Sequence, residues 1–427
     1  MQLLYISAHF PPCAASGVFR VLGFIRWLHE TGWTIAVLAL HTIEEERLDP
    51  ELLERVPGEV RVYKTGYVNP FSLRDALKKT CRKRQISSEE GGETKKQGSA
   101  ASMPEYSWKD SVSYLLKTPD SYLGWLPMGI LCALLKISRP DVILATAPPF
   151  SAFVMATILK FLWRVPLVVD FRDPWVNNPL RAIRPGWAGK LDGFLERMVL
   201  RNADVVILNT DEARRLYQHQ YPDQASRMHT VTNGFDSRFT DIAPASSPMP
   251  DMLWIVYVGA LYGKRSPNKI IEAVLLFDDI ILDLFGPGVE SYLELASDRV
   301  RLSPQVTHQG AVALQKGADV TLVIGNCLEQ AMQIPAKVFE VMALAKNIWL
   351  IDSSDSPARR LLREAGLPHY YSTPTYESIF ETLRQMHIDW RGKKISTNRL
   401  PEELIQQFDR RILAEQLGQL LNSVIEP

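Results

Sequence analysis

The chain has 427 residues, which at about 150 residues per domain predicts two large or three ordinary domains and excludes a single small module. Its 48 Lys and Arg residues balance its 48 Asp and Glu residues. A bulk electrostatic attraction is therefore excluded, and nucleic acid is not an expected partner. With 46% hydrophobic and 22% charged residues, the composition is that of a folded globular protein in which any anion site must be local.

The four cysteines lie far apart without CxxC or Cys/His metal spacing, which favours a reducing compartment over a disulfide framework or a metal site.

The N-terminal residues 1–7 lack a basic flank, so we expect a first strand there rather than a signal peptide. The apolar stretch 150–169 contains Lys160, Arg164 and Pro166, and we interpret it as a helix and a strand rather than a membrane span. The expected location is the cytoplasm.

Short runs rich in Val, Ile and Leu alternate with amphipathic stretches, which is typical of βαβ units with parallel strands buried on both faces. In the first half, strands are predicted at 3–7, 34–40, 60–63, 142–145, 167–170, 205–209 and 229–231. In the second half, they are predicted at 254–258, 280–285, 306–309, 320–324 and 348–351. The pattern predicts an α/β protein with two parallel sheets.

Prolines and small residues at 241–251 indicate an exposed linker between two similar halves. We therefore predict an N-terminal domain over 1–240 and a C-terminal domain over 250–405. Segment 80–104 is too polar to bury a core and is predicted to be a mobile insertion in the first domain. The final segment, 406–427, has apolar residues at helical spacing and should form a closing amphipathic helix.

One candidate site group follows the first predicted strand. It consists of His9, Gly17 and Arg20. A glycine where a strand turns into a helix lets the backbone approach a ligand, and the helix N-terminus attracts an anion such as a phosphate. The alternative is a plain helix-starting glycine, because the pattern is neither a dinucleotide fingerprint nor a P-loop.

A second group, Asp170, Arg172 and Asp173, lies just beyond a predicted buried strand. Side chains at that position lie in the crevice where open α/β sheets bind ligands. The alternative is an Asp/Arg pair that organises the loop, and Asp170, nearest the strand, fits that structural role best.

The second half contains three further signals. Gly259 and Arg265 follow a predicted strand and precede Ser-Pro at a helix start, a combination suited to a diphosphate. Gly286 ends another strand and suits close approach to a base or ribose, although a lone Gly-x-Gly is more often only a turn. Lys337 and Glu340 share one helix face, where a carboxylate can accept both ribose hydroxyls and a lysine can neutralise phosphate. The alternative for this pair is a weak surface ion pair.

Taken together, these motifs resemble those of the retaining nucleotide-sugar glycosyltransferases of the GT-B fold, specifically the large family 4 group. The matching residues are Phe10-Pro11-Pro12 with Gly17 and Arg20, Asp170 to Trp175, Ala203 to Ile207 with Thr210, Thr232 to Asp236, Val258-Gly259 with Arg265, and Lys337 to Glu340. The resemblance implies two Rossmann-like domains that face each other across a cleft. The acceptor would lie on the N-terminal domain and the donor mainly on the C-terminal one, and the last helix would cross back.

The resemblance also implies residue roles. Glu340 would hold the donor ribose, Arg265 and Lys337 would neutralise the diphosphate, and Asp173 would position the acceptor or stabilise the cation-like sugar. The expected donor-binding set is Gly17, Arg20, Gly259, Arg265, Gly286, Lys337 and Glu340, and the acceptor-side set is His9, Asp170, Arg172 and Asp173. Cations and helix dipoles would stabilise the departing nucleoside diphosphate, so no metal and no cofactor is expected. The leaving phosphate itself would take the acceptor proton, with retention of configuration.

One position departs from the family pattern. The family commonly has another glutamate that contacts the donor sugar, and seven residues separate it from the ribose glutamate. Counted back from Glu340, that position is Met332 in this sequence. Glu329 is nearby but out of register. Met332 motivates one alternative, a catalytically silent nucleotide-binding or scaffold protein. The other alternative is a nucleotide-sugar epimerase of the GT-B fold, which would need more acid/base groups in the cleft.

Basic residues concentrate between Arg74 and Arg84, where six cations accompany one acid, Asp75, for a local charge of +5. Such a run can dock on an anionic membrane with about 1 kcal/mol per cation, and the alternative is a solvated loop. The resemblance implies a glycan or lipid-linked acceptor, cell-surface polysaccharide or glycolipid synthesis, and a place for peripheral contact at the inner membrane face.

Overall fold

The computed structural model describes residues 1–41, 48–68, 114–115, 117–179, 181, 184, 186–263, 265–304, 306–325, 327, 332–344, 347–367, 369–395 and 401–426. The predicted insertion at 80–104 and the basic run Arg74–Arg84 lie outside these residues.

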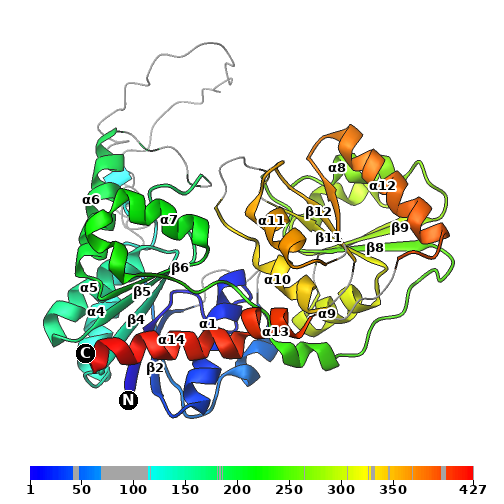
Figure 1. Cartoon of the computed structure of the whole chain (residues 1–427). Coiled ribbons are helices and arrows are strands. Elements are labelled where there is room, and N and C mark those ends of the chain that lie inside the picture. Colours follow the sequence, from blue (N-terminus) through cyan, green and yellow to red (C-terminus); the bar gives the residue numbers. More distant parts are fainter. Residues whose placement is uncertain are drawn as a thin grey trace, which may run out of the picture.

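Two sheets, all of whose pairings are parallel, form the centre of the described structure (Figure 1). The first has the order β3-β2-β1-β4-β5-β6-β7 and the second the order β10-β9-β8-β11-β12-β13. The strands are β1 Gln2–Ile6, β2 Thr34–Leu40, β3 Arg61–Thr65, β4 Val142–Ala147, β5 Leu167–Phe171, β6 Val205–Leu208, β7 Met228–Thr230, β8 Leu253–Val258, β9 Ile280–Phe285, β10 Val300–Ser303, β11 Val320–Ile324, β12 Asn347–Ile351 and β13 His369–Ser372. When the strands of each sheet are numbered from its first strand in the chain, the second sheet has the 3-2-1-4-5-6 order of Rossmann domains. The first sheet has the same order with one further strand, β7, at its end. The predicted α/β fold class, with two Rossmann-like domains, is confirmed.

The helices are α1 Ser16–Glu30, α4 Trp125–Lys136, α5 Ser151–Trp163, α6 Gly186–Asn202, α7 Asp211–Gln220, α8 Asn268–Val274, α9 His308–Gly317, α10 Ala336–Ala343, α11 Pro357–Glu364, α12 Tyr376–Arg391, α13 Glu402–Phe408 and α14 Arg410–Ile425. Short 3-10 helices are η2 Pro50–Arg55, η3 Pro222–Arg227, η4 Ser237–Asp241 and η5 Val289–Leu295. Several helices begin at hydroxyl caps: the side chains of Thr210, Thr307, Ser356 and Thr375 each accept a backbone N–H bond three residues further on. Such caps satisfy N–H groups that the helix itself leaves unpaired.

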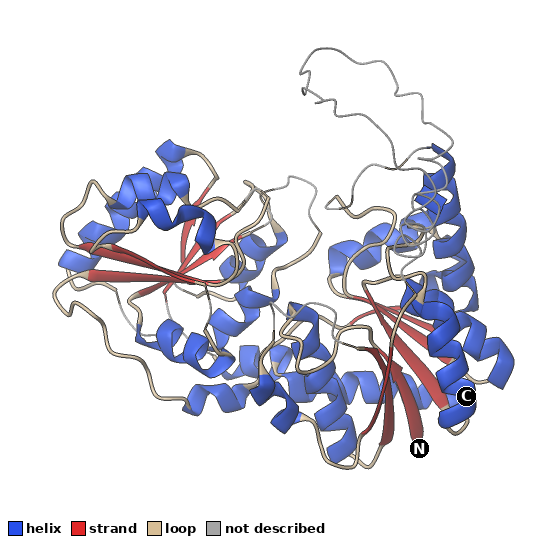
Figure 2. Cartoon of the chain, turned by 180° about the vertical axis from the view of Figure 1, so that it is seen from behind, coloured by secondary structure: helices blue, strands red, loops and turns tan. Residues whose placement is uncertain are grey.

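Helices cover both faces of the first sheet. One face packs against α4, α5 and α6 through a core that contains Trp125, Phe153 and Leu200. The other face packs against α1 and α14. In the second domain, α8 and α12 lie over one face of the sheet, and α10 and α11 contribute to a core on the other. The two layered domains stand side by side, and both chain termini lie on the first (Figure 2).

The last helix, α14, belongs spatially to the first domain. Its residues Leu413, Leu417 and Leu421 share a buried cluster with Val21 and Phe24 of α1. Figure 1 shows α14 running along α1 although the two lie at opposite ends of the sequence. The chain therefore crosses between the domains twice, once after β7 and once before α14.

The predicted strand at 306–309 is wrong. Thr307 caps α9, and His308 is the first residue of that helix. The strand in this region is β10, which the sequence reading misses together with β13. Both lie at the edges of the second sheet, where one side of a strand need not be apolar and the buried-strand signal weakens.

The apolar stretch 150–169 forms α5 and most of β5, as predicted. Among the described residues, no helix is both long and apolar enough to span a membrane. The linker is predicted at 241–251; Asp241 is the last residue of η4, and residues 242–251 contain neither helix nor strand.

Candidate active site

Loops beyond the carboxyl ends of the two sheets meet at the boundary between the domains. Thr210, which follows β6, donates its hydroxyl hydrogen to the carbonyl oxygen of Met332 at 2.7 Å. The Met332 side chain packs against the core of the first domain. On the other side of the boundary, His308 of α9 lies over Phe19 of α1, with ring centroids 4.6 Å apart. Crevices beyond the carboxyl ends of parallel strands are where such folds bind ligands.

Glu340 of α10 lies among three basic side chains. Its carboxylate oxygens lie 2.6 Å from Nζ of Lys337, 3.8 Å from Nε2 of His308 and 4.0 Å from Nη2 of Arg410. Burial raises the pKa of the Glu340 carboxyl, but the charge of Lys337, followed by the effects of His308 and Arg410, outweighs burial and lowers that pKa well below its usual value. Glu340 is therefore ionised at neutral pH although its side chain is only 13% exposed.

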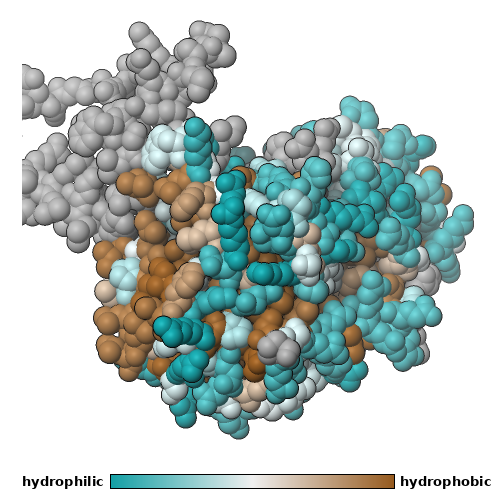
Figure 3. Space-filling model, turned by 60° about the vertical axis from the view of Figure 1, so that its left-hand side comes forward, coloured by the Kyte–Doolittle hydropathy of each residue, from teal (hydrophilic) through white to brown (hydrophobic). Residues whose placement is uncertain are grey.

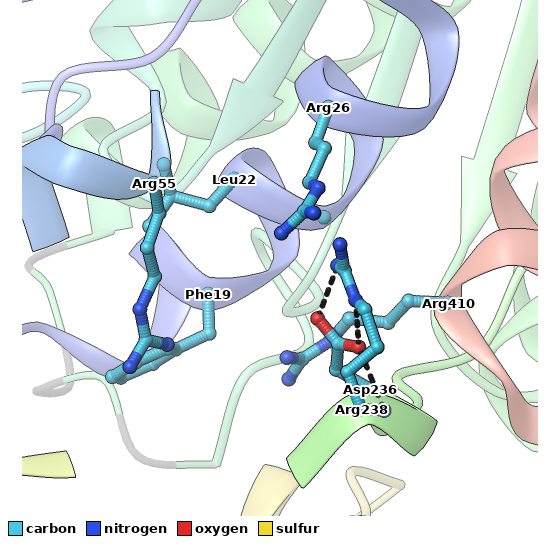
Figure 4. A pocket seen from close by; sticks show the side chains of 8 residues that line it. Phe19, Leu22, Arg26, Arg55, Asp236, Arg238 and Arg410 are labelled. Carbon is cyan, nitrogen blue, oxygen red and sulfur yellow. Dashed lines mark hydrogen bonds and ion pairs between the residues drawn. The ribbon is translucent and has the colours of Figure 1, made fainter. Parts of the chain in front are cut away.

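A hollow of about 300 Å³, including space open to solvent, lies next to this cluster (Figure 4). Its lining consists of Phe19, Leu22, Gly23, Arg26, Arg55, Asp236, Arg238 and Arg410. Asp236 accepts hydrogen bonds from Nε and Nη2 of Arg238 at 2.7 and 2.6 Å. Asp236 and Arg410 stand at the two places where the chain crosses between the domains. Four arginines and one aspartate thus make the region around these two crossings positively charged beside Glu340.

Arg265 lies in the loop after β8. Its guanidinium carbon is 4.8 Å from the centroid of the Tyr262 ring, and its Nε donates to the carbonyl oxygen of Gly325 at 3.4 Å. Gly286, after β9, has a φ of +128°, and a Cβ there would lie 2.3 Å from the carbonyl oxygen of Gly259. The glycine is therefore required where these two loops pack closely. Gly259, Arg265 and Gly286 lie on adjoining loops of the second domain, whereas Lys337 and Glu340 lie on α10.

Arg20 and Asp170 form a buried ion pair in the first domain. Nε and Nη2 of Arg20 donate to the two carboxylate oxygens at 2.9 and 2.8 Å, and the side chains are 4% and 1% exposed. Arg20 also donates to the carbonyl oxygens of Val231 and Thr232, and Thr146 donates to Asp170. These bonds use the guanidinium group of Arg20 and the carboxylate of Asp170, which a substrate would need for its own contacts. The structure therefore favours a structural role for both residues over the predicted donor and acceptor contacts.

Arg172 points toward the start of α1. A Cβ at Gly17 would lie only 1.2 Å from Nη1 of Arg172, so Gly17 makes room for this guanidinium. Arg172 also donates through Nη2 to the carbonyl oxygen of Pro148. His9, in the loop between β1 and α1, lies edge-on to Tyr122 with ring centroids 6.1 Å apart. The predicted acceptor-side residues thus lie around the loops that follow β1, β4 and β5.

Asp173 and Gln333 meet across the domain boundary. Burial raises the pKa of Asp173, and the charge of Arg172 and the approach of the Gln333 amide oppose that rise without cancelling it. Gln333 is 7% exposed, and neither atom of its amide makes a hydrogen bond of good geometry with the described residues. Oδ1 of Asn209 is also buried without such a partner. A perturbed carboxyl beside unsatisfied buried amides is the arrangement expected where a polar ligand binds.

Comparisons with known proteins agree with this geometry. Residues 97–234 match the family described as a glycosyl transferase 4-like domain, although residues 97–113 lie outside the described structure. The fold is similar to that of Anabaena HepE in complex with UDP and glucose, with a TM-score of 0.66 at 15% identity over 99% of this chain and 100% of that chain. The chain has the GT-B fold, and its residues 97–234 match a glycosyl transferase 4-like domain.

Two further solved structures are similar to this chain in fold. Sucrose-phosphate synthase from Thermosynechococcus elongatus has a TM-score of 0.62 at 15% identity, over 99% of this chain and 98% of that chain. The UDP-GlcNAc 2-epimerase of Neisseria meningitidis, bound to UDP-GlcNAc, has a TM-score of 0.51 at 11% identity, over 99% and 100% of the two chains. The search of curated proteins found no match to this sequence.

Three residues of the candidate site are not predicted from the sequence. His308 falls within the wrongly predicted strand, although Thr307 is a recognisable helix cap that could have corrected it. Gln333 adjoins the position of the missing family glutamate, and that adjacency is a usable signal. Arg410 reaches Glu340 from 70 positions further along the chain, so no local pattern indicates it.

Proposed function

We propose that this protein is a glycosyltransferase that moves a sugar from a nucleoside-diphosphate sugar to a hydroxyl acceptor with retention of anomeric configuration. The observation that supports this proposal most directly is the ionised, largely buried Glu340 beside Lys337 on α10. HepE has been solved with UDP and with UDP-glucose, which makes UDP-sugars the first donors to test.

In this proposal, Glu340 accepts hydrogen bonds from the two ribose hydroxyls, because an ionised carboxylate offers only acceptors. Lys337 and Arg265 neutralise the diphosphate, and the positive end of α10 adds to their effect. Negative charge grows on the departing nucleoside diphosphate as the glycosidic bond breaks. Fixed positive groups that already face this charge lower the barrier without rearranging. The leaving phosphate then takes the proton of the acceptor hydroxyl.

Asp173 is proposed to face the reacting sugar from the first domain. Its carboxylate would stabilise the positive charge that develops on the sugar ring, and Gln333 would hold that carboxylate in place from the second domain. Met332 occupies the position of the family's sugar-binding glutamate, but it packs into the boundary between the domains. Contacts to the donor sugar would therefore come from groups such as the Gln333 amide rather than from a glutamate at that position.

The acceptor is proposed to be a glycan or a lipid-linked sugar, in cell-surface polysaccharide or glycolipid synthesis. We place the enzyme in the cytoplasm because its four cysteines lie far apart in the sequence, without the spacing of a disulfide framework, as expected in a reducing compartment. Peripheral membrane contact through Arg74–Arg84 remains a proposal on residues outside the described structure.

The decisive experiment offers purified protein a panel of UDP-sugars with and without acceptor extracts, and measures UDP release and the fate of the sugar. Transfer with UDP release supports the proposal. Interconversion of one UDP-sugar into another without an acceptor would instead support the epimerase, which the structural neighbours of that class make a real alternative. Nucleotide binding with neither reaction would support the silent protein that Met332 suggests.

A change of Asp173 to asparagine should lower kcat by about a hundredfold or more while leaving UDP affinity within about twofold. Because burial raises the pKa of Asp173, its active carboxylate form should be lost at a higher pH than for an ordinary aspartate. The wild-type rate should therefore fall on the acid side with a midpoint above 3.8, the usual aspartate value, and the variant should lack this limb.

The stability of the same variant provides the control for misfolding. Ionising a buried carboxyl costs folding free energy, so the neutral amide should leave the stability at pH 7 unchanged or slightly higher. A variant that is both inactive and strongly destabilised would contradict the proposed role and indicate a structural one.

Removal of divalent metal ions should leave the transfer rate within about twofold, since Arg265, Lys337 and the start of α10 are proposed to neutralise the leaving group. The measurement is UDP-coupled turnover before and after treatment with EDTA, with added Mg²⁺ as the reversal. Loss of activity that Mg²⁺ restores would show that the cations of the protein are insufficient.

A further inference from the structure

The outer surface of α4, α5 and α6 is unusually apolar for a layer that no other described element covers. These helices pack side by side, α4 on α5 and α5 on α6. Large apolar side chains on them are exposed, among them Leu135 at 73% and Phe194 at 61%. The full set is Met128, Leu131, Leu134, Leu135, Ile158, Phe161, Leu162, Trp187 and Phe194. We call this set with its neighbouring basic residues the outer face, and Figure 3 shows it as a continuous apolar area on this side of the first domain.

The spacing of these residues shows that each helix has two apolar sides. On α5, the outward Ile158, Phe161 and Leu162 recur at helical spacing, while Phe153 and Leu159 fill the core beneath the helix. A helix whose only task is to cover a sheet needs a single apolar stripe with a polar opposite face. The second stripe therefore points to a ligand or surface that is itself apolar.

Basic residues complete the outer face. Along α6, Trp187, Lys190, Phe194, Arg197 and Arg201 follow one another at intervals of three or four, so aromatic and basic side chains alternate on one exposed side. The last residue of α4, Lys136, is exposed as well. This combination of aromatic rings with Lys and Arg is typical of protein surfaces that lie in the headgroup region of a bilayer.

Acidic side chains do not offset this charge. The two acids of α6 point inward: Asp192 lies 3.1 Å from Nη1 of Arg184, and Glu196 accepts a hydrogen bond from the hydroxyl of Tyr217 at 2.6 Å. Both are buried. Among the described residues of these three helices, every exposed charged side chain is therefore basic. The outer face combines apolar area with positive charge only.

We propose that the outer face of α4, α5 and α6 docks the protein on an anionic lipid bilayer. The rings and aliphatic side chains would enter the interfacial region, and the two lysines and two arginines would contact lipid phosphates. A second copy of the chain fits less well, because a two-fold interface would bring the same basic residues of both copies together and oppose like charges. This inference goes beyond the proposed function and does not depend on the donor or on the run Arg74–Arg84.

The test is flotation of the purified full chain with vesicles of phosphatidylcholine that contain phosphatidylglycerol, at low and at high salt. The wild type should float with these vesicles at low salt and much less with pure phosphatidylcholine. A Phe161→Ser/Leu162→Ser variant and an Arg197→Gln/Arg201→Gln variant should each reduce vesicle binding about tenfold. The matched control is Leu276→Ser/Leu293→Ser on the second domain, where the two leucines are similarly exposed; it should float like the wild type.

Folding of the variants is verified by their thermal unfolding, which exposed positions should not shift. The inference is overturned if the wild type remains at the bottom of the gradient, if either outer-face variant floats like the wild type, or if neutral vesicles bind equally well. It is also overturned if the wild type is a dimer that Phe161→Ser/Leu162→Ser converts to a monomer without any flotation, because a second copy then covers this face. None of these outcomes depends on transferase activity, so failure here and failure of the proposed function are distinguishable.

Discussion

Replacement of Glu340 by glutamine should weaken UDP binding by roughly ten- to a hundredfold, because a hydrogen bond to a charged group contributes about 1.5–3 kcal/mol. The amide keeps the size of the side chain but removes the charge and one of its acceptors. It also leaves Lys337 and Arg410 without the carboxylate that lies 2.6 and 4.0 Å from them. The positions of these cations should therefore become less well defined, in addition to the weakened contact with the ribose. We expect kcat to fall together with the affinity for UDP.

The measurement is calorimetric titration with UDP at neutral pH. Glu381→Gln is the matched control, because Glu381 pairs with Arg384 on α12 with the same three-residue spacing but is largely exposed. That control should bind UDP like the wild type, as surface pairs contribute little. If Glu340→Gln also binds UDP with unchanged affinity, Glu340 is not a ribose ligand and the proposed donor site is misplaced.

The pH dependence of the free energy of unfolding provides a second test of the role of Glu340. The pKa of Glu340 in the folded protein lies well below the usual 4.5, so its ionised form stabilises the folded state at every pH above that usual value. This contribution is lost as the pH falls below 4.5 toward the folded-state pKa. The stability difference between the wild type and Glu340→Gln should therefore be largest near neutrality and shrink in acid.

Buried parallel strands are the elements that the sequence predicts best. The bounds 34–40, 280–285 and 320–324 agree with β2, β9 and β11 residue for residue. Each of these strands is buried along nearly its whole length, so its sequence reads as an unbroken apolar run. β10 and β13 escape this signal because their sequences, Val-Arg-Leu-Ser and His-Tyr-Tyr-Ser, are those of half-polar edge strands.

The candidate site is less predictable because its members lie far apart in the chain. The spacing of Lys337 and Glu340 is local, and the expected pairing on one helix face is present at 2.6 Å. Arg20 and Asp170, by contrast, are 150 positions apart, and nothing near either residue shows that they satisfy each other. A conspicuous charge after a buried strand can face a substrate or another charge, and only the tertiary structure distinguishes these cases.

Removal of one partner of the Arg20–Asp170 pair should therefore affect stability rather than binding. Asp170→Asn should destabilise the first domain by about 3–5 kcal/mol, because it leaves a buried guanidinium without its counter-charge. The measurement is urea unfolding followed by tryptophan fluorescence, since Trp175 is buried in that domain. Glu30→Gln is the control: Glu30 pairs with Arg26 on the surface of α1 at 3.1 Å, and its loss should change stability by at most about 1 kcal/mol.

A double variant separates the two interpretations of this pair. Arg20→Met/Asp170→Leu removes both charges, so it should be less destabilised than Asp170→Asn, although the carbonyl oxygens of Val231 and Thr232 lose their donor. Under conditions where it remains folded, this variant should bind UDP like the wild type, because neither charge faces the donor. Lost UDP affinity with intact stability would instead return Arg20 to the donor site and would mean that the buried pair opens when nucleotide binds.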